Sequence, residues 1–265
     1  MTITAPLAVK AWKLGLIGLA AGLMSGGFGI GGGIVMVPLL VAVGVDRHRA
    51  HATSLAAIIP IAIAGSVAFG LSGEINLTLG LLIGAGGVVG STIGASLMNR
   101  MSTRSLSIFF GIVLLVVAIR MVAGGDPLPG SSDFSEPLQV AIAVGIGLIS
   151  GFFAGVAGIG GGVVIVPATV LLLGFTQHEA QGTSLVAIIL TAIAGTVVNV
   201  RNRRVRLEDG LVIGLIGVVG SVVGAQIALG VEGRTLSLVF GVLVMVLAIR
   251  TLYLAFRGAE PVTQP

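Results

Sequence analysis

Long apolar stretches separated by short polar segments run along nearly the whole chain. In the first half they cover 8–44, 52–71, 77–98 and 105–122, and their counterparts in the second half begin near Leu138, Thr183, Leu207 and Thr235. Several approach the ~20 residues that a helix needs to cross the hydrocarbon core of a bilayer. The pattern predicts an all-α integral membrane protein.

The second half of the chain repeats the first. The motif Ile-Gly-Gly-Gly at 30–33 returns at 159–162, an offset of 129 residues, and Thr-Ser-Leu at 53–55 returns at 183–185, an offset of 130 residues. Self-similarity at a nearly constant offset is typical of a duplicated architecture. We therefore divide the chain at its longest polar segment, which is rich in glycine and proline. The parts are a first membrane repeat (8–122), a linker (123–137) and a second membrane repeat (138–256).

Glycine interrupts the first apolar stretch of each repeat. Stretch 8–44 has about 37 residues, too many for one span of ~20, and the glycine-rich run 26–33 lies inside it. We expect two short limbs that meet at the glycines. Each repeat is then a broken glycine-rich helix hairpin followed by three transmembrane helices.

The charged residues predict how the repeats are oriented, because short cytoplasmic loops carry an excess of Lys and Arg. Arginine occurs at 47 and 49, at 100 and 104, and four times from 201 to 206, whereas the linker carries Asp126, Asp133 and Glu136. This distribution places both termini in the cytoplasm and equivalent loops of the two repeats on opposite sides. We expect inverted-topology repeats, the arrangement of many secondary transporters.

Composition excludes several classes of function. Hydrophobic residues make up 55% of the chain, charged residues only 9%, and the mean hydropathy is +1.15, whereas a soluble domain devotes about a quarter of its residues to charge. The net charge of +4 comes from residues in short loops rather than along one face, so we expect no nucleic-acid partner. The chain has no cysteine, and its apolar stretches lack a Ser-His-Asp arrangement or a His-Glu metal motif. We expect neither an enzyme nor a bound cofactor.

The glycine triplets are the main candidates for a substrate site. A break in a membrane helix leaves backbone groups unpaired, which is tolerated only where the backbone is buried in protein or lines a wet cavity. The short helix after each triplet would present its amide groups and positive dipole end to that cavity, which favours an anion. The alternative is that the glycines only permit close packing. The candidate residues are Gly31, Gly32, Gly33, Gly160, Gly161 and Gly162.

Small residues also form a stripe on the third helix of each repeat, spaced at three and four. This spacing predicts close packing against a neighbouring helix. The stripe consists of Gly80, Gly84, Gly87, Ser91 and Gly94, with counterparts at Gly210, Gly214, Gly217, Ser221 and Gly224.

Hydroxyl and imidazole side chains recur beside the glycine runs. Thr53 and Ser54, like Thr183 and Ser184, are expected to open the helix after each hairpin, where they would either cap it or bind an oxyanion. Equivalent histidines precede these pairs, and they would bind the substrate, pass a coupling proton or lie in a surface loop. They are His48 and His178.

A metal site is the less favoured interpretation of the histidines. His48 and His51 have the spacing of a metal-binding pair on a helix, but Gln181 occupies the position equivalent to His51. We therefore expect no metal ligands, and we keep His51 and Gln181 with the candidates for substrate or proton coupling.

The two glycine motifs together resemble a known family. The residues are 25–33 with Pro38 and the Thr-Ser pair at 53–54, then 158–162 with Pro167 and the pair at 183–184. They are similar to the sulfite exporter TauE/SafE family, also grouped as toluene-sulfonate uptake permeases, and the resemblance extends over 11–254. It implies a bacterial-type inner-membrane permease for sulfite, organosulfonates or related sulfur-containing anions.

The sequence therefore predicts a secondary transporter that works by alternating access. Its expected partners are a small anionic solute and the lipid bilayer, with a proton as the candidate coupling ion and a homo-oligomer left open. Two alternatives remain: a passive anion channel, and a divalent metal-ion permease that uses His48, His51 and His178.

Overall fold

The computed structural model describes residues 9–97, 103–124, 134–157, 161–201 and 207–257, and these parts of the chain contain ten helices and no strand. In chain order the helices are α1 (Ala11–Phe28), α2 (Gly33–Ala42), α3 (Arg47–Leu71), α4 (Leu77–Leu97), α5 (Thr103–Val122), α6 (Glu136–Ala157), α7 (Gly162–Leu173), α8 (Gln177–Arg201), α9 (Leu207–Leu229) and α10 (Gly233–Phe256). The prediction of an all-α fold is confirmed.

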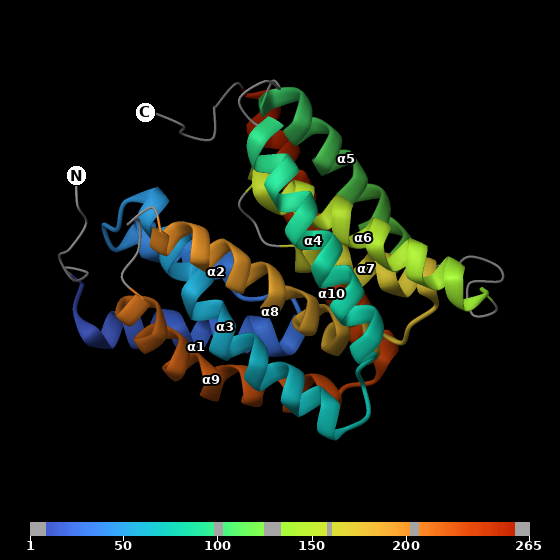
Figure 1. The fold of residues 1–265 in the computed structure, drawn as a ribbon, viewed down its shortest axis with the longest axis horizontal. Helices are drawn as coiled ribbons and strands as arrows, with labels where there is room; N and C mark the ends of the chain where they lie inside the picture. The colour runs from blue at the N-terminus through green and yellow to red at the C-terminus, as the bar shows by residue number, and fades with distance from the viewer. Residues whose placement is uncertain (1–8, 98–102, 125–133, 158–160, 202–206, 258–265) are drawn as a thin grey trace.

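Each half begins with a long helix and a short one and continues with three further helices (Figure 1). Seven of the described helices are long and apolar enough to cross a membrane. Helix α5 is not among them, because only Ser107–Val122 of it counts as an apolar segment, and the two short helices, α2 with 10 residues and α7 with 12, are not either. At 1.5 Å per residue they extend about 15 and 18 Å, roughly half of a ~30 Å hydrocarbon core.

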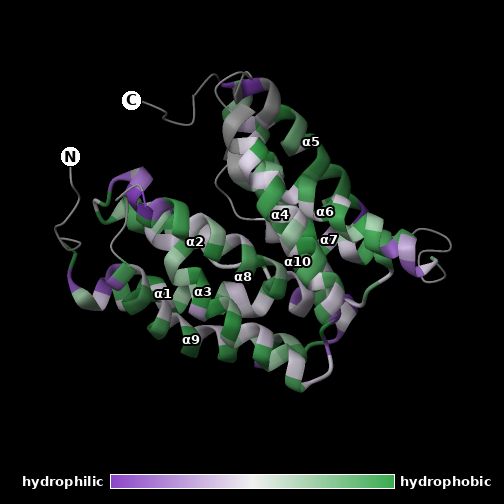
Figure 2. Cartoon of the chain, viewed as in Figure 1, coloured by the Kyte–Doolittle hydropathy of each residue, from purple (hydrophilic) through white to green (hydrophobic). Residues whose placement is uncertain are grey.

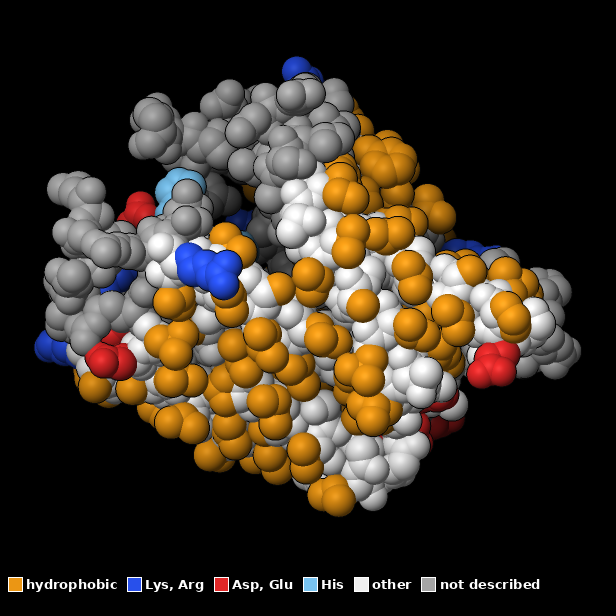
Figure 3. Space-filling view, in the orientation of Figure 1, with side chains coloured by type: hydrophobic (Ala, Val, Ile, Leu, Met, Phe, Trp, Pro, Cys, Tyr) orange, Lys and Arg blue, Asp and Glu red, His pale blue; other side chains and the backbone are white. Residues whose placement is uncertain are grey.

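The outer surface of the bundle is apolar along the helices. Figure 2 shows polar residues gathered near helix ends, and Figure 3 shows hydrophobic side chains spread over the visible face. On α9, for example, Leu215 is 63% exposed and Val219 is 60% exposed. Apolar patches of this extent mark a surface that contacts something other than water, and here they suit lipid.

The helices of the two halves interleave in a regular way. Helix α1 packs on α9 and its counterpart α6 on α4, while α3 packs on α9 and its counterpart α8 on α4. The pairs α3 with α8 and α5 with α10 join equivalent helices. The main contacts between the halves are therefore preserved when the halves are exchanged.

Glycines make the closest of these contacts. A Cβ atom added to Gly22 of α1 would lie 2.0 Å from the Gly217 carbonyl oxygen of α9, and one added to Gly151 of α6 would lie 2.1 Å from the Gly87 oxygen of α4. No side chain fits at such distances, so the backbones touch directly. The predicted close packing of the small-residue stripes is confirmed.

The helices after the hairpins begin earlier than predicted. Helix α3 starts at Arg47 rather than near residue 52, and α8 starts at Gln177 rather than at Thr183. The carboxylate of Asp46 caps α3 by accepting hydrogen bonds from the His48 and Arg49 amides at 3.0 and 3.2 Å. At the start of α8 the Thr176 hydroxyl accepts from the Glu179 amide at 3.1 Å. The prediction that the Thr-Ser pairs open these helices is therefore wrong, because a polar, capped first turn precedes each pair.

Candidate functional site

The first glycine break joins the end of α1 to the start of α2. Gly29 ends α1 in a left-handed conformation (φ 69°), and its amide donates to the Ser25 carbonyl oxygen at 2.7 Å. Gly31 and Gly32 follow with φ of 79° and 71°. Only glycine adopts these angles without strain. The three glycines let the chain reverse direction within four residues.

The start of α2 carries backbone amides without helical partners. The first backbone hydrogen bonds of α2 run from the Val35 and Met36 amides to the Gly32 carbonyl oxygen. Among the described residues, the amides of Gly31, Gly32 and Gly33 make no backbone hydrogen bond. Such free amides are typical of a helix N-terminus and are suited to binding an anion.

The second break is described only in part. Gly160 lies outside the described residues, while Gly161 precedes α7 and Gly162 is its first residue. Gly161 has φ of −72°, an ordinary right-handed angle, unlike its counterpart Gly32. The two breaks therefore differ in backbone conformation at equivalent positions.

The two breaks meet inside the protein. A Cβ atom built on Gly162 would lie 2.6 Å from the Ile30 Cα and 2.8 Å from the Gly29 carbonyl oxygen. Ile30 lies three residues before Gly33, the first residue of α2. The start of α7 therefore lies against the break that leads from α1 into α2. The positive dipole end of a helix favours an anion nearby.

One face of α8 lies against the first break. The Ser184 hydroxyl donates to the Gly29 carbonyl oxygen. A Cβ on Gly29 would lie 2.7 Å from the Gln181 Cα, and a Cβ on Gly31 would lie 3.0 Å from the Ile188 Cγ2. Two residues predicted from the sequence, Ser184 and Gln181, thus lie beside the glycines of the first break.

The threonines of the two pairs have different surroundings. The Thr183 hydroxyl accepts a hydrogen bond from the Asn76 amide at 2.9 Å, which fixes the chain just before α4. Thr53 is buried, and its hydroxyl has no partner in the described parts of the chain. Ser54, also buried, donates to the His51 carbonyl oxygen of its own helix at 2.9 Å. Of the second Thr-Ser pair, the serine hydroxyl donates to the first break, whereas the threonine hydroxyl accepts from Asn76.

The histidines lie at helix starts. His48 is exposed in the first turn of α3, and His51 is partly buried one turn further along. The His178 Nε2 lies 3.0 Å from the Ala228 oxygen and 3.1 Å from the Val231 oxygen, so this nitrogen carries the proton and donates. His178 thereby ties the start of α8 to the turn between α9 and α10. No group of three or more His, Cys, Asp or Glu side chains suited to a metal occurs within the described residues.

An ion pair that the sequence did not predict joins α3 to α9. The Arg49 Nη2 lies 3.1 Å from the Asp209 Oδ2, and both side chains are largely buried. In the sequence, Arg49 indicates only that its loop faces the cytoplasm. Its partner lies 160 residues away, and no local pattern indicates the pairing.

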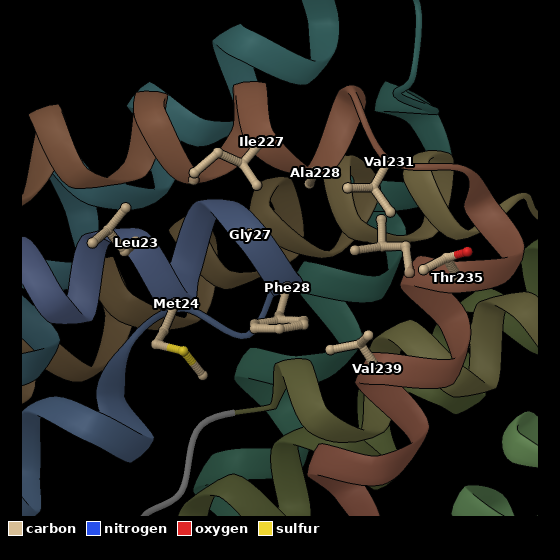
Figure 4. A pocket seen from close by; sticks show the side chains of 11 residues that line it. Leu23, Met24, Gly27, Phe28, Ile227, Ala228, Val231, Thr235 and Val239 are labelled. Atoms are coloured by element: carbon tan, nitrogen blue, oxygen red, sulfur yellow. The ribbon is translucent and has the colours of Figure 1, made fainter.

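Two apolar cavities lie outside this site. One of about 380 Å³ is bordered by the end of α1 and the start of α10, where Met24, Phe28 and Val239 surround it (Figure 4). Another of about 550 Å³ is lined by Phe109, Phe152 and other apolar residues. Neither cavity includes a candidate site residue, and such walls would not replace the hydration of an anion. The glycine site itself is closed, because Ser184 is fully buried.

Comparisons with known proteins place the chain among membrane transporters. A profile of the family described as Sulfite exporter TauE/SafE matches residues 3–121 and 143–264. The Bacillus subtilis protein named Probable membrane transporter protein YunE is 27% identical over 261 residues, which cover 90% of this chain and 96% of that protein. A probable membrane transporter protein of Xylella fastidiosa is 29% identical over 262 residues, covering 96% of this chain and 97% of its own.

Proposed function

Because the chain belongs to the sulfite exporter TauE/SafE family, whose matched relatives are named as membrane transporters, we propose that it is a secondary transporter for a sulfur-containing anion. Sulfite, an organosulfonate or a related anion is the proposed substrate. The observation that carries this proposal is the meeting of Gly162, at the start of α7, with Gly29 and Ile30 of the first break, beside the amides at 31–33 that make no backbone hydrogen bond among the described residues. A small anion is the ligand that such free amides and a helix N-terminus favour.

We propose that the two halves are inverted-topology repeats. The exchange symmetry of the helix contacts supports this arrangement, since each repeat packs on the other in the same way. The short helices α2 and α7 would then enter from opposite sides, each reaching about half-way through the bilayer. The arginine-rich loops would face the cytoplasm together with both chain termini.

The proposed substrate site combines backbone amides with hydroxyls. The amides at 31–33 and 160–162 would bind the oxyanion, and the hydroxyls of Ser184 and Ser54 would donate to it once their present bonds to carbonyl oxygens break. Thr183 would hold the start of α4 in place through Asn76. Thr53, whose hydroxyl has no partner in the described parts of the chain, stays a candidate donor to the anion. Alternating access would separate the two breaks on one side at a time, as rocking of repeats does in other inverted-repeat transporters.

Sulfite flux into proteoliposomes tests this proposal. A carrier gives saturable uptake and counterflow, in which internal unlabelled sulfite accelerates entry of labelled sulfite. Uptake that neither saturates nor shows counterflow would support the passive channel instead.

Thermal unfolding of the purified protein in detergent identifies the substrate class. The panel contains sulfite, an organosulfonate, thiosulfate, sulfate, chloride and divalent metals. A ligand at ~100 times its Kd stabilises the folded protein by ~2.7 kcal/mol. Stabilisation by a transition metal alone would refute the anion assignment.

A further inference from the structure

Two buried amide side chains of α8 lack hydrogen-bond partners. Gln177 is 5% exposed and Gln181 is 0% exposed. Within the described structure, the Oε1 and Nε2 atoms of both residues have no partner. Buried polar groups in folded proteins are nearly always paired with protein or ordered water. These four amide atoms on successive turns of one helix are therefore available to a ligand or to water.

These amides lie on the face of α8 that packs against the first break. Residues 177, 181, 184 and 188 are spaced by four, three and four, so they share one side of the helix. On that side Gln181 adjoins Gly29, Ser184 donates to the Gly29 oxygen, and Ile188 adjoins Gly31. Gln177 is the first residue of α8. The two amides thus lie in line between the start of α8 and the glycine site.

We propose that Gln177 and Gln181 line the route by which the anion passes between the extracellular side and the glycine break. This inference rests on the proposed function and adds a path to its site. Each amide offers two N–H donors that can replace water around an oxyanion. A neutral amide binds an anion without holding it as a fixed positive charge would, and passage requires binding weak enough for release.

The opposite approach carries different chemistry. At an offset of 130 residues, the first repeat has Arg47 and His51 in its sequence where the second has Gln177 and Gln181. In the proposed orientation, the cytoplasmic start of α3 is therefore richer in basic residues than the extracellular start of α8.

Cysteine accessibility tests the route directly, because the chain contains no native cysteine. Gln177→Cys and Gln181→Cys variants are expressed in cells and exposed to a membrane-impermeant, sulfonate-bearing methanethiosulfonate reagent. The matched control is Val186→Cys, since Val186 is also buried but lies on the opposite face of α8, against Gly80 of α4. We expect both route positions to react from outside about tenfold faster than the control, because thiol reactivity follows access.

Sulfite flux in proteoliposomes provides the second measurement. Gln177→Leu and Gln181→Leu should each lower kcat/KM by about fivefold through the loss of donors to the anion. The control Gln139→Leu removes an amide at the start of α6, which donates to the Phe134 oxygen instead, and should retain the wild-type value.

The outcomes separate the route from the proposed function. Wild-type sulfite flux combined with cysteines at 177 and 181 as unreactive as the Val186 control would overturn the route and leave the transporter standing. Reaction from the cytoplasmic side alone would overturn the extracellular placement. If the cysteines at 177 and 181 react but the protein transports no sulfur-containing anion, the water-filled route is supported and the substrate assignment is refuted.

Discussion

The meeting of the two breaks can be tested by adding a single methyl group to Gly162. In Gly162→Ala, the new Cβ would lie 2.6 Å from the Ile30 Cα, 2.8 Å from the Gly29 oxygen and 2.9 Å from the Ile188 Cδ1. Carbon atoms pack favourably at ~3.5–4.0 Å, so α7 and the first break must separate by about 1 Å. Overpacking of this kind costs about 1–3 kcal/mol of folding stability. A displacement of ~1 Å at a reacting site can reduce turnover about 100-fold, and we expect a similar loss of transport.

The neighbouring glycine provides the control. Gly161 has φ of −72°, which alanine adopts freely, and the nearest atom to its Cβ would be the Ile165 Cδ1, a flexible side-chain end, at 3.3 Å. Gly161→Ala removes the same kind of residue one position away without forcing the breaks apart. Its folding stability should stay within about 1 kcal/mol of wild type.

Both variants are purified in detergent, where their thermal unfolding is compared with and without sulfite, and then reconstituted for sulfite flux at equal protein content. The expected Gly162→Ala protein is folded, has a lower Tm, shows weaker stabilisation by sulfite and transports far less than Gly161→Ala. Equal Tm and equal flux in the two variants would refute the argument that the substrate binds where the breaks meet.

Two further variant pairs test the packing around the site by thermal unfolding in detergent. Ser184→Ala leaves the buried Gly29 oxygen without its hydroxyl donor and should lower the folding stability by about 1–3 kcal/mol. Ser54→Ala should cost less, because the Ser54 hydroxyl bonds only within its own helix, and equal losses would contradict the inter-helix role of Ser184. Gly22→Ala places a Cβ 2.0 Å from a carbonyl oxygen of α9 and should lower the Tm, whereas Gly145→Ala has nothing within 4 Å and should leave it unchanged or raised. A Gly22→Ala protein as stable as wild type would show that α1 and α9 do not touch there.

The order and approximate bounds of the helices could be predicted because most apolar stretches have about the length of a span and end at polar residues or glycine, and glycines divide the longer ones. The start of α3 could not be read from hydropathy. Its first turn, Arg47 to Arg49, is polar, but the carboxylate of Asp46 satisfies its free amides and extends the helix into what the sequence indicates as a loop. Capping shifted this boundary by five residues relative to the predicted one.

The different contacts of the threonine and the serine within one Thr-Ser pair could not be predicted from the sequence either. Adjacent residues on a helix point about 100° apart, so one pair cannot face one ligand as a unit. Thr183 contacts Asn76, 107 residues away, and Ser184 contacts Gly29, 155 residues away. Which of the two reaches the glycines depends on how α8 is rotated between the first break and α4, and only the tertiary packing sets that rotation.

The duplicated sequence explains why the breaks occur where they do. A helix of about 15 Å, such as α2, ends inside the hydrocarbon core, where its free amides would be costly unless protein or a ligand satisfied them. In the proposed inverted arrangement, α7 enters from the other side and extends about 18 Å, so the two limbs together match a core of ~30 Å. In this arrangement, the short helix of each repeat crosses the half of the bilayer that the short helix of the other repeat does not reach. In that arrangement the pathway would be closed where Gly162 meets Ile30, and we propose that movement of either repeat at that point opens one side of it.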